Sequence, residues 1–379
     1  MSSERTDPMR VLGFGTYDKT KHPRPGILLD GLRELGDDVS ELNAPLGFST
    51  AERVAMLAKP WLAYRLVVRL CRRWLTLTAG SLRPSGSRPD AVLVGYLGHF
   101  DVVLARLLFP RTPIALDMLI FAADTARDRG HAGAGKRRIL TMLDRLAIRC
   151  ASLVIVDTEE NARLISGSQR HKAVVVPVGA PADWFVTEIG AAVPGPLRVV
   201  FFGLFTPLQG APVIGEAISA LPPDAPIEIT LVGTGQDLAE TKGRAGDTNL
   251  AIWKDWLEPD ELQELVKSQD VCLGIFADSP KAVRVVPNKV FQGAAAGCLV
   301  LTSDTPPQRR SFGDFAQYVQ PNSGAELAKA LTNLASERGG LDRLRKGSLE
   351  HAQHNFRPGA IARTLHDALV TRTQKRDIR

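Results

Sequence analysis

The 379-residue sequence is poor in cysteine and contains no long apolar run. Its four cysteines are scattered, without a Cys-x-x-Cys pair or a nearby histidine cluster, so neither a zinc site nor a disulfide framework is indicated. No uninterrupted apolar stretch of about 18 residues occurs, which argues against a membrane-spanning helix. Residues 1–8 are polar and charged, unlike a signal peptide or an anchor. We therefore expect a cytoplasmic protein that is soluble or at most peripheral to the inner face of the membrane.

The sequence also lacks an Asp-x-Asp pair and a large excess of one charge. Without that motif a metal-chelated diphosphate is not expected, and we predict neither a metal ion nor a cofactor. The 47 Lys and Arg residues against 41 Asp and Glu residues give a net charge of +6. This balance favours anionic partners such as nucleotides, phosphates or an acidic membrane surface, but it is too mild to indicate nucleic acid.

What is present is a regular alternation of short apolar runs and helical-period stretches, which is typical of parallel sheets with crossover helices. Two domains are expected at this length, because single cores seldom exceed about 250–300 residues. In the first half we predict strands at 10–14, 91–96, 113–116, 152–157 and 173–178, and helices at 25–35, 101–108 and 136–151. Asp101 is expected to cap the second of these helices. A glycine- and proline-rich stretch, 186–196, is the predicted linker.

The alternation then restarts. Strands are predicted at 197–202, 227–232, 250–253, 271–276, 299–302 and 317–319, and helices at 213–220, 260–268, 288–296 and 325–334. After residue 341 the pattern is purely helical, at 341–355 and 358–373. Two successive Rossmann-like halves are the simplest interpretation.

Three glycine turns follow predicted strands: Gly13 to Gly15, Gly203 with the segment up to Gly210, and Gly233 to Gly235. Glycine lets backbone N–H groups approach an anion at a helix N-terminus. None of the three completes the fingerprint of a nicotinamide-binding fold, so an oxidoreductase is disfavoured. Each turn is equally compatible with a tight connection that binds nothing.

The segment 281–297 has the most concentrated pattern. Lys281, Arg284 and Lys289 precede or open a helix of small residues, so a ligand can approach the helix closely while its N-terminal dipole and the cations face an anion. The alternative is a solvated basic loop before a tightly packed helix. We expect an anion-binding site at this edge of the second sheet.

Two further features have both a functional and a structural interpretation. His99 follows the predicted strand 91–96, at the sheet edge where open α/β folds bind ligands, but it is equally compatible with a histidine packed in a loop. The stretch 51–78 is basic and amphipathic. It is compatible with a helix on an anionic membrane, although a surface helix packing its Leu/Trp stripe on its own domain is the more common case.

Along nearly the whole chain these pieces resemble the retaining nucleotide-sugar glycosyltransferases of family 4, which have the GT-B architecture. The likeness rests on Gly13 and Gly15, His99, and the segments 200–203, 231–235 and 288–300. It implies an α/β fold of two Rossmann-like domains whose parallel sheets face each other across a cleft. Residues 1–190 would form the acceptor-side domain, 197–355 the donor domain, and 356–379 a helix that crosses back to the first domain.

The sequence departs from the family pattern at four positions. The Arg and Lys that clamp the diphosphate are replaced by Leu204 and Gln209, and two glutamates eight positions apart become Arg284 and Gln292. We infer that Lys281, Arg284 and Lys289 replace the missing clamp. The amide of Gln292 can still bind a ribose hydroxyl, because it both donates and accepts hydrogen bonds.

The resemblance implies transfer of a hexose-type sugar from a nucleotide diphosphate sugar to an acceptor hydroxyl, with retention and without a protein nucleophile. The expected catalytic residues are His99, Arg284 and Lys289. The expected donor-binding residues are Gly203, Thr206, Gln209, Gly210, Gly233, Trp256, Lys281, Asn288 and Gln292. The expected acceptor-side residues are Gly15, Thr16, Tyr17 and Arg24.

The acceptor itself stays open between a lipid-linked saccharide, a polysaccharide and a small natural product. Two other functions also stay open. One is a non-hydrolysing nucleotide-sugar epimerase on the same architecture. The other is a catalytically silent protein that binds nucleotide sugars, which the lost family residues motivate.

Overall fold

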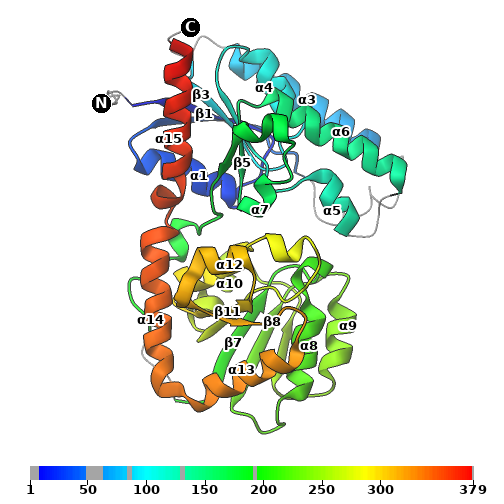
Figure 1. The fold of residues 1–379 in the computed structure, drawn as a ribbon, viewed down its shortest axis with the longest axis vertical. Helices are drawn as coiled ribbons and strands as arrows, with labels where there is room; N and C mark the ends of the chain where they lie inside the picture. Colours follow the sequence, from blue (N-terminus) through cyan, green and yellow to red (C-terminus); the bar gives the residue numbers. More distant parts are fainter. Residues whose placement is uncertain (1–7, 48–62, 83–87, 129–132, 191–193, 378–379) are drawn as a thin grey trace.

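The computed structural model describes residues 8–47, 63–82, 88–128, 133–190 and 194–377. In these ranges the chain forms two α/β lobes, each built on a six-stranded sheet in which all paired strands are parallel (Figure 1). This confirms the predicted fold class. The carboxyl ends of parallel strands meet at one edge of each sheet, and that edge is where side chains for a site can converge.

The N-terminal sheet has the order β2-β1-β3-β4-β5-β6. Its strands are β1 (Arg10–Gly15), β2 (Asp38–Asn43), β3 (Ala91–Val94), β4 (Ile114–Asp117), β5 (Leu153–Val156) and β6 (Ala173–Val175). The helices are α1 (Arg24–Glu34), α3 (Ala63–Ser81), α4 (Asp101–Leu108), α5 (Ala122–Asp128), α6 (Ala134–Cys150) and α7 (Glu159–Ala162). Helices α3, α4 and α6 cover one face of the sheet, and α1 covers the other.

The C-terminal sheet has the order β12-β11-β10-β7-β8-β9. Its strands are β7 (Leu197–Phe202), β8 (Ile227–Val232), β9 (Ala251–Lys254), β10 (Val271–Leu273), β11 (Leu299–Ser303) and β12 (Ala316–Val319). The helices are α8 (Ala211–Ala220), α9 (Leu238–Ala245), α10 (Pro259–Lys267), α11 (Asn288–Ala295), α12 (Pro306–Phe312) and α13 (Gly324–Ser336).

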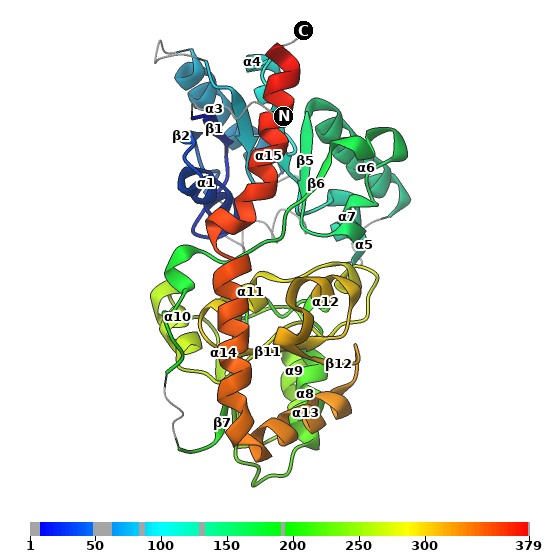
Figure 2. The same ribbon diagram turned by 60° about the vertical axis from the view of Figure 1, so that its left-hand side comes forward.

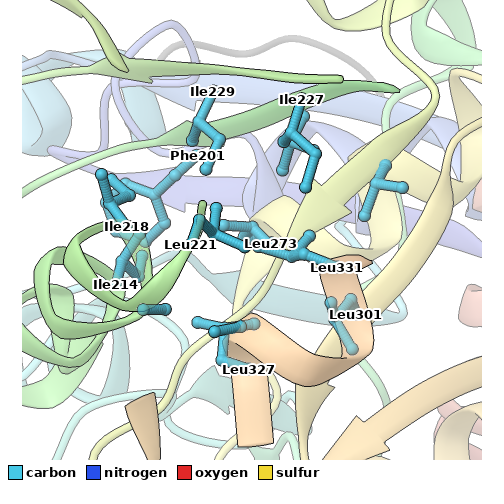
Figure 3. Close-up of a cluster of buried hydrophobic side chains, with 14 of the residues drawn as sticks. Phe201, Ile214, Ile218, Leu221, Ile227, Ile229, Leu273, Leu301, Leu327 and Leu331 are labelled. Carbon is cyan, nitrogen blue, oxygen red and sulfur yellow. The ribbon is translucent and has the colours of Figure 1, made fainter. Parts of the chain in front are cut away.

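The apolar runs that predicted the C-terminal strands form its core. Ile214 and Ile218 of α8 and Leu327 of α13 pack against Phe201 and Leu273 of the sheet (Figure 3). Burying each such side chain contributes about 1.5–3 kcal/mol. Because this core fixes the sheet, the loops at its carboxyl edge rest on a rigid base.

The last two helices join the lobes. Helix α14 (Arg338–Asn355) lies along the C-terminal lobe, and α15 (Pro358–Asp377) lies along the N-terminal lobe (Figure 2). Ile361, Leu365 and Leu369 of α15 are buried in the same cluster as residues of α1. The backbone N–H of Ala180, between the lobes, donates to the carbonyl of Phe356 between α14 and α15. No helix in the described ranges has the length and apolar character needed to cross a bilayer.

The structure corrects two local expectations. Strand β2 was not predicted, because four of its six residues are polar and all six are exposed or half-buried at the sheet edge. Asp101 does not cap α4; Phe100 occupies the N-cap position, and Asp101 is the first helical residue. Its carboxylate accepts hydrogen bonds from Thr16 and from the indole of Trp74 instead. A tertiary contact has replaced the local one.

Candidate functional site

In the C-terminal sheet the strand order changes direction between the neighbouring strands β7 and β10. In open α/β sheets such a point leaves a crevice beyond the carboxyl ends of the two strands, where ligands bind. Here the crevice lies between the turn after β7, which begins at Gly203, and the segment that leads from β10 to α11. Most of the predicted donor-binding residues belong to these two segments.

The glycine turns after β7 and β8 pack backbone against backbone. Gly203 and Gly233 have φ values of +124° and +133°, which side chains rarely adopt. A Cβ on Gly233 would stand 2.0 Å from the carbonyl oxygen of Gly203. Gly210, at φ +63°, lets the start of α8 approach the backbone of Ala277 after β10. The glycines therefore close the floor of the crevice around exposed backbone at Gly203.

Lys289 is buried at the edge of this floor. It is the second residue of α11, and Pro287 occupies the N-cap position. Its side chain is 5% exposed, and its Nζ lies 3.5 Å from the centroid of the Phe201 ring and 3.6 Å from the position of a Cβ on Gly203. The ammonium has no hydrogen-bond partner among the described residues. Burial lowers the pKa of Lys289 from 10.5 to about 7, while the nearby Cys272 thiol acts in the opposite direction.

Two other polar atoms in loops at the carboxyl edge of this sheet are also buried without a partner in the described part of the chain: Gln209 Oε1 and Thr305 Oγ1. Buried polar groups in native proteins are almost always hydrogen-bonded, so each exception requires an explanation. They come from the loops after β7 and β11, which lie on either side of β10 in the sheet. A bound polar ligand would supply the missing partners.

Thr305 was not predicted from the sequence. It is 2% exposed and occupies the N-cap position of α12, but its side chain forms no capping hydrogen bond. The Thr-Pro-Pro sequence that begins two residues after the end of a buried strand is the signal that could have identified it, since a threonine followed by proline commonly starts a helix.

The remaining predicted donor-side residues lie on α11 and in the loops after β7 and β9. Asn288 and Gln292 are half-buried and four residues apart on α11, so they share one face of the helix. Thr206 occupies the N-cap position of the short 3₁₀ turn Pro207–Gln209 and is half-buried. Trp256, in the loop after β9, is 71% exposed. An aromatic ring in that position is free to stack on a base.

The side chains of Lys281 and Arg284 point away from Lys289. Lys281 is the N-cap of the 3₁₀ turn Ala282–Arg284 and Arg284 is its last residue, and both side chains contact helix α5 of the other lobe. Arg284 donates from one nitrogen to both carboxylate oxygens of Asp124, at 2.8 and 2.9 Å, and Lys281 donates to Thr125 at 2.9 Å. The carbonyl of Arg284 also accepts from the Thr158 hydroxyl at 2.7 Å. The expected cluster of three cations is therefore divided between the crevice and the junction of the lobes.

His99 lies in the loop after β3, as expected, but it is only 7% exposed. Its Nε2 is 3.1 Å from Oδ1 of Asp144 in α6. The same carboxylate accepts hydrogen bonds from the backbone N–H groups of Ala122 and Ala123, at the start of α5. His99 is thus connected through Asp144 to the helix that Arg284 and Lys281 contact.

The predicted acceptor-side residues separate into two groups. Gly15 and Thr16 lie at the carboxyl end of β1, where Asp101 holds the Thr16 backbone and hydroxyl at 2.8 and 2.7 Å. Tyr17 is buried and donates to Glu41, and burial raises its pKa.

Arg24 is 1% exposed and fully engaged within the lobe. It donates to Asp117 at 2.8 Å and to the carbonyls of Val176 and Pro177. Asp157 lies nearby, and burial raises its pKa to about 6, although Arg24 acts to lower it. The hydrogen-bond donors of Arg24 are thus directed to partners inside the N-terminal lobe.

Among the described residues, no group of three or more His, Cys, Asp or Glu side chains is arranged to hold a metal ion.

Comparison with solved structures gives full-length matches. HepE from Anabaena, in complex with UDP-glucose, matches with a TM-score of 0.67 and 14% identity, over 96% of this chain and 100% of that one. Sucrose-phosphate synthase from Thermosynechococcus elongatus matches with a TM-score of 0.69 and 13% identity, over 97% and 100% of the two chains. The fold is GT-B.

The GT-B fold is shared by enzymes of different activity. A putative UDP-N-acetylglucosamine 2-epimerase from Listeria monocytogenes matches with a TM-score of 0.56 and 12% identity, over 97% and 98% of the two chains. Residues 216–367 match a sequence family described as "Glycosyl transferase-like", and this range includes the crevice residues after β10. No curated protein matches the chain in sequence.

Proposed function

We propose that this chain is a glycosyltransferase that binds a nucleotide diphosphate sugar at the carboxyl edge of its C-terminal sheet. The observation that carries the proposal is the buried, unpartnered ammonium of Lys289 at the strand reversal, beside Gly203 and the N-terminus of α11. A diphosphate would supply the anion that this position lacks. The family match over residues 216–367 and the UDP-glucose bound by HepE support the same ligand class.

In the proposed reaction, Lys289 and the first backbone N–H groups of α11 stabilise the departing nucleoside diphosphate. The bond between the sugar C1 and the phosphate oxygen breaks, and a bond from C1 to the acceptor oxygen forms on the same face of the sugar. The acceptor proton passes to the departing phosphate oxygen. Preorganised charge of this kind lowers the barrier without a protein nucleophile. Retention, a hexose-type sugar and independence of metal are parts of this proposal.

We assign the other predicted residues to supporting roles. Gln209, Thr305 and Gln292 are donor-side hydrogen-bonding groups, and Trp256 is the stacking surface for the base. Lys281 and Arg284 set the position of the N-terminal lobe against the donor. His99 faces the transferred sugar from the N-terminal lobe and is oriented by Asp144.

The experiment has two stages. Thermal shifts are measured against a panel of nucleotides and nucleotide sugars, where a ligand at a hundredfold excess over its Kd stabilises by about 2.7 kcal/mol. The donor found in this way is then incubated with and without candidate acceptors. Lys289→Ala should remove donor binding and transfer, whereas Lys329→Ala, at an exposed lysine of α13, should change neither. Wild-type binding and turnover in Lys289→Ala would refute the assignment.

A non-hydrolysing epimerase is the second candidate, because one structural neighbour is a putative enzyme of that kind. It would convert the donor alone, with no acceptor and no release of nucleotide. Donor binding without either reaction would instead identify a catalytically silent nucleotide-sugar-binding protein.

A further inference from the structure

The outer surface of the helix layer α3, α4 and α6 combines exposed apolar side chains with positive charge. These helices have 19, 8 and 17 residues, yet they carry eight of the sixteen large apolar side chains that are most exposed in the described chain. The eight are Tyr64, Val67, Val68 and Leu75 of α3, Leu107 of α4, and Ile139, Met142 and Leu146 of α6. Leu75 and Leu107 are more than 70% exposed.

In α3 these residues form a stripe that is separate from the one packed on the sheet. Residues 51–62 of the predicted amphipathic stretch lie outside the described residues. In the described remainder, Leu77 is buried in the N-terminal core and Trp74 packs against it, so a Leu/Trp stripe faces the domain here. Tyr64, Val68 and Leu75 recur at helical spacing on a different side. A surface helix that only packs on its own domain needs one apolar stripe, and α3 has two.

Helix α6 repeats the arrangement. Ala147 and Ile148 are buried in the same core, while Ile139, Met142 and Leu146 lie three and four residues apart on the outer side. Helix α4 contacts both α3 and α6, so the three lie in one layer (Figure 1). A layer of parallel elements on a sheet presents a broad, shallow surface rather than a groove.

The charge of this surface has one sign. Helix α3 contains Arg65, Arg69, Arg72 and Arg73 and no carboxylate. Helix α6 contains Arg137, Arg138, Arg145 and Arg149 among its basic residues. The single acidic residues of α4 and α6, Asp101 and Asp144, are both buried and hydrogen-bonded inside the lobe. An open cavity of about 390 Å³ beside Leu46 and Gly47 is lined by Arg69, Arg72 and Arg73, with room for an anionic group.

From this combination we propose that the α3/α4/α6 surface docks on an anionic lipid bilayer. Apolar side chains at this surface would enter the acyl boundary while the flanking arginines contact lipid phosphates. A soluble polyanion such as nucleic acid would use the arginines but would leave eight large apolar side chains in water. The breadth of the layer and the absence of exposed carboxylates on its described helices match a flat, uniformly negative partner. This inference is independent of the proposed transferase activity.

The test is sedimentation of the full-length protein with vesicles of phosphatidylglycerol and phosphatidylcholine, compared with phosphatidylcholine alone. Binding should require phosphatidylglycerol and weaken as salt is raised. Leu75→Glu combined with Ile139→Glu should reduce the partition coefficient at least about tenfold. Arg72→Ala combined with Arg145→Ala should reduce it roughly 25-fold, since each arginine near an anionic surface contributes about a factor of five.

Two controls make the result specific. Leu164→Glu alters an exposed leucine outside the layer and should bind vesicles as the wild type does. Unfolding temperatures of all variants should match the wild type, because the replaced side chains are exposed.

Three results would overturn the proposal. The first is wild-type protein that ignores anionic vesicles. The second is protein that binds heparin or duplex RNA but not vesicles, and that still binds them when Leu75 and Ile139 are replaced by Glu. The third is a dimer that the Glu substitutions dissociate, because a second copy would then cover the surface.

Discussion

Replacing Lys289 with methionine should stabilise the free protein and abolish its reaction. Methionine has nearly the length of lysine and no charge, so it can fill the same space against the Phe201 ring. The pKa of Lys289 falls from 10.5 to about 7 because burial disfavours the charged form. That difference corresponds to roughly 4–5 kcal/mol of free energy that the charged side chain costs the folded state. The cation–π contact is lost in the variant, so we expect a net gain of about 2–4 kcal/mol.

The gain should depend on pH in a defined direction. The pKa of Lys289 is lower in the folded than in the unfolded protein, so between the two values the unfolded chain holds a proton that the folded chain has lost. The cost of burying the charged Lys289 therefore reduces the wild-type stability in full below about pH 7. It decreases by about 1.4 kcal/mol per pH unit above 7 and vanishes near the unfolded pKa. The stability difference between Lys289→Met and the wild type should therefore be largest at pH 7 and below, and should shrink as the pH rises.

Denaturant unfolding, followed between about pH 6 and 9, measures this difference, with each lobe fitted separately if two transitions appear. For a lobe of roughly 150–250 residues, each kcal/mol corresponds to about 2–4 °C in the unfolding temperature. Lys329→Met is the matched control and should stay within about 0.5 kcal/mol of the wild type at every pH. A Lys289→Met variant that is destabilised, or whose stability difference is the same at all pH values, would contradict the unpaired buried ammonium.

Donor binding should show the complementary effect. A diphosphate beside Lys289 raises its pKa, so binding takes up a proton whenever the free side chain is neutral. For a nucleotide diphosphate sugar, whose two phosphates are both esterified, affinity should fall up to about tenfold per pH unit above 7. Calorimetry in buffers of different ionisation enthalpy detects the proton directly. Affinity that does not change between pH 7 and 9 would exclude Lys289 from the diphosphate.

Other changes test the surroundings of the crevice. Gly233→Ala should eliminate donor binding, because its Cβ would meet the Gly203 carbonyl at 2.0 Å. Gly246→Ala, which has open space around its Cβ but an unfavourable backbone conformation, should cost about 1–3 kcal/mol and bind the donor normally, as a thermal shift with donor would show. Arg284→Ala and Asp124→Ala should each reduce turnover, and the double variant should be no slower than either single variant, because each substitution removes the same ion pair. Losses of turnover that add up in the double variant would show that the ion pair is not the relevant contact. Arg24→Met should destabilise the N-terminal lobe by about 3–5 kcal/mol, because a buried carboxylate loses its partner, and unchanged unfolding would contradict this role.

The sequence predicted the strands well wherever they are buried on both faces. Such strands read as continuous apolar runs, as in Leu197–Phe202 and Ile227–Val232. Strand β2 was missed because an edge strand needs no apolar run, and Asp38–Asn43 has only two apolar residues, Val39 and Leu42. Asp101 was misjudged for another reason. Its partners Thr16 and Trp74 are 85 and 27 residues away, and no local pattern reports such contacts.

The junction between the lobes could not be predicted at all. Asp124 and Asp144 show no motif, yet Asp124 binds Arg284, and Asp144 holds both His99 and the start of α5. The Asp124–Arg284 contact exists only because two separately folded lobes are brought together, and the Asp144 contacts join segments that are 22 and 45 residues apart in the sequence. Sequence periodicity describes each sheet, whereas the positions of the lobes depend on side chains that any surface helix could carry.

The separation of the three cations has a local physical cause. Lys281 and Arg284 are three residues apart across one 3₁₀ turn, in which side chains at that spacing lie on the same side, so both reach α5. The turn ends at Val285, and Pro287 then occupies the N-cap position of α11, in which Lys289 points inward toward β7. Spacing in the sequence suggested a shared charge, but the intervening proline divides it. What remains in the crevice is a single ammonium in surroundings of low polarity, where its attraction for a phosphate is much stronger than that of an exposed cluster. In the proposed reaction one buried lysine, rather than three exposed cations, therefore binds the diphosphate.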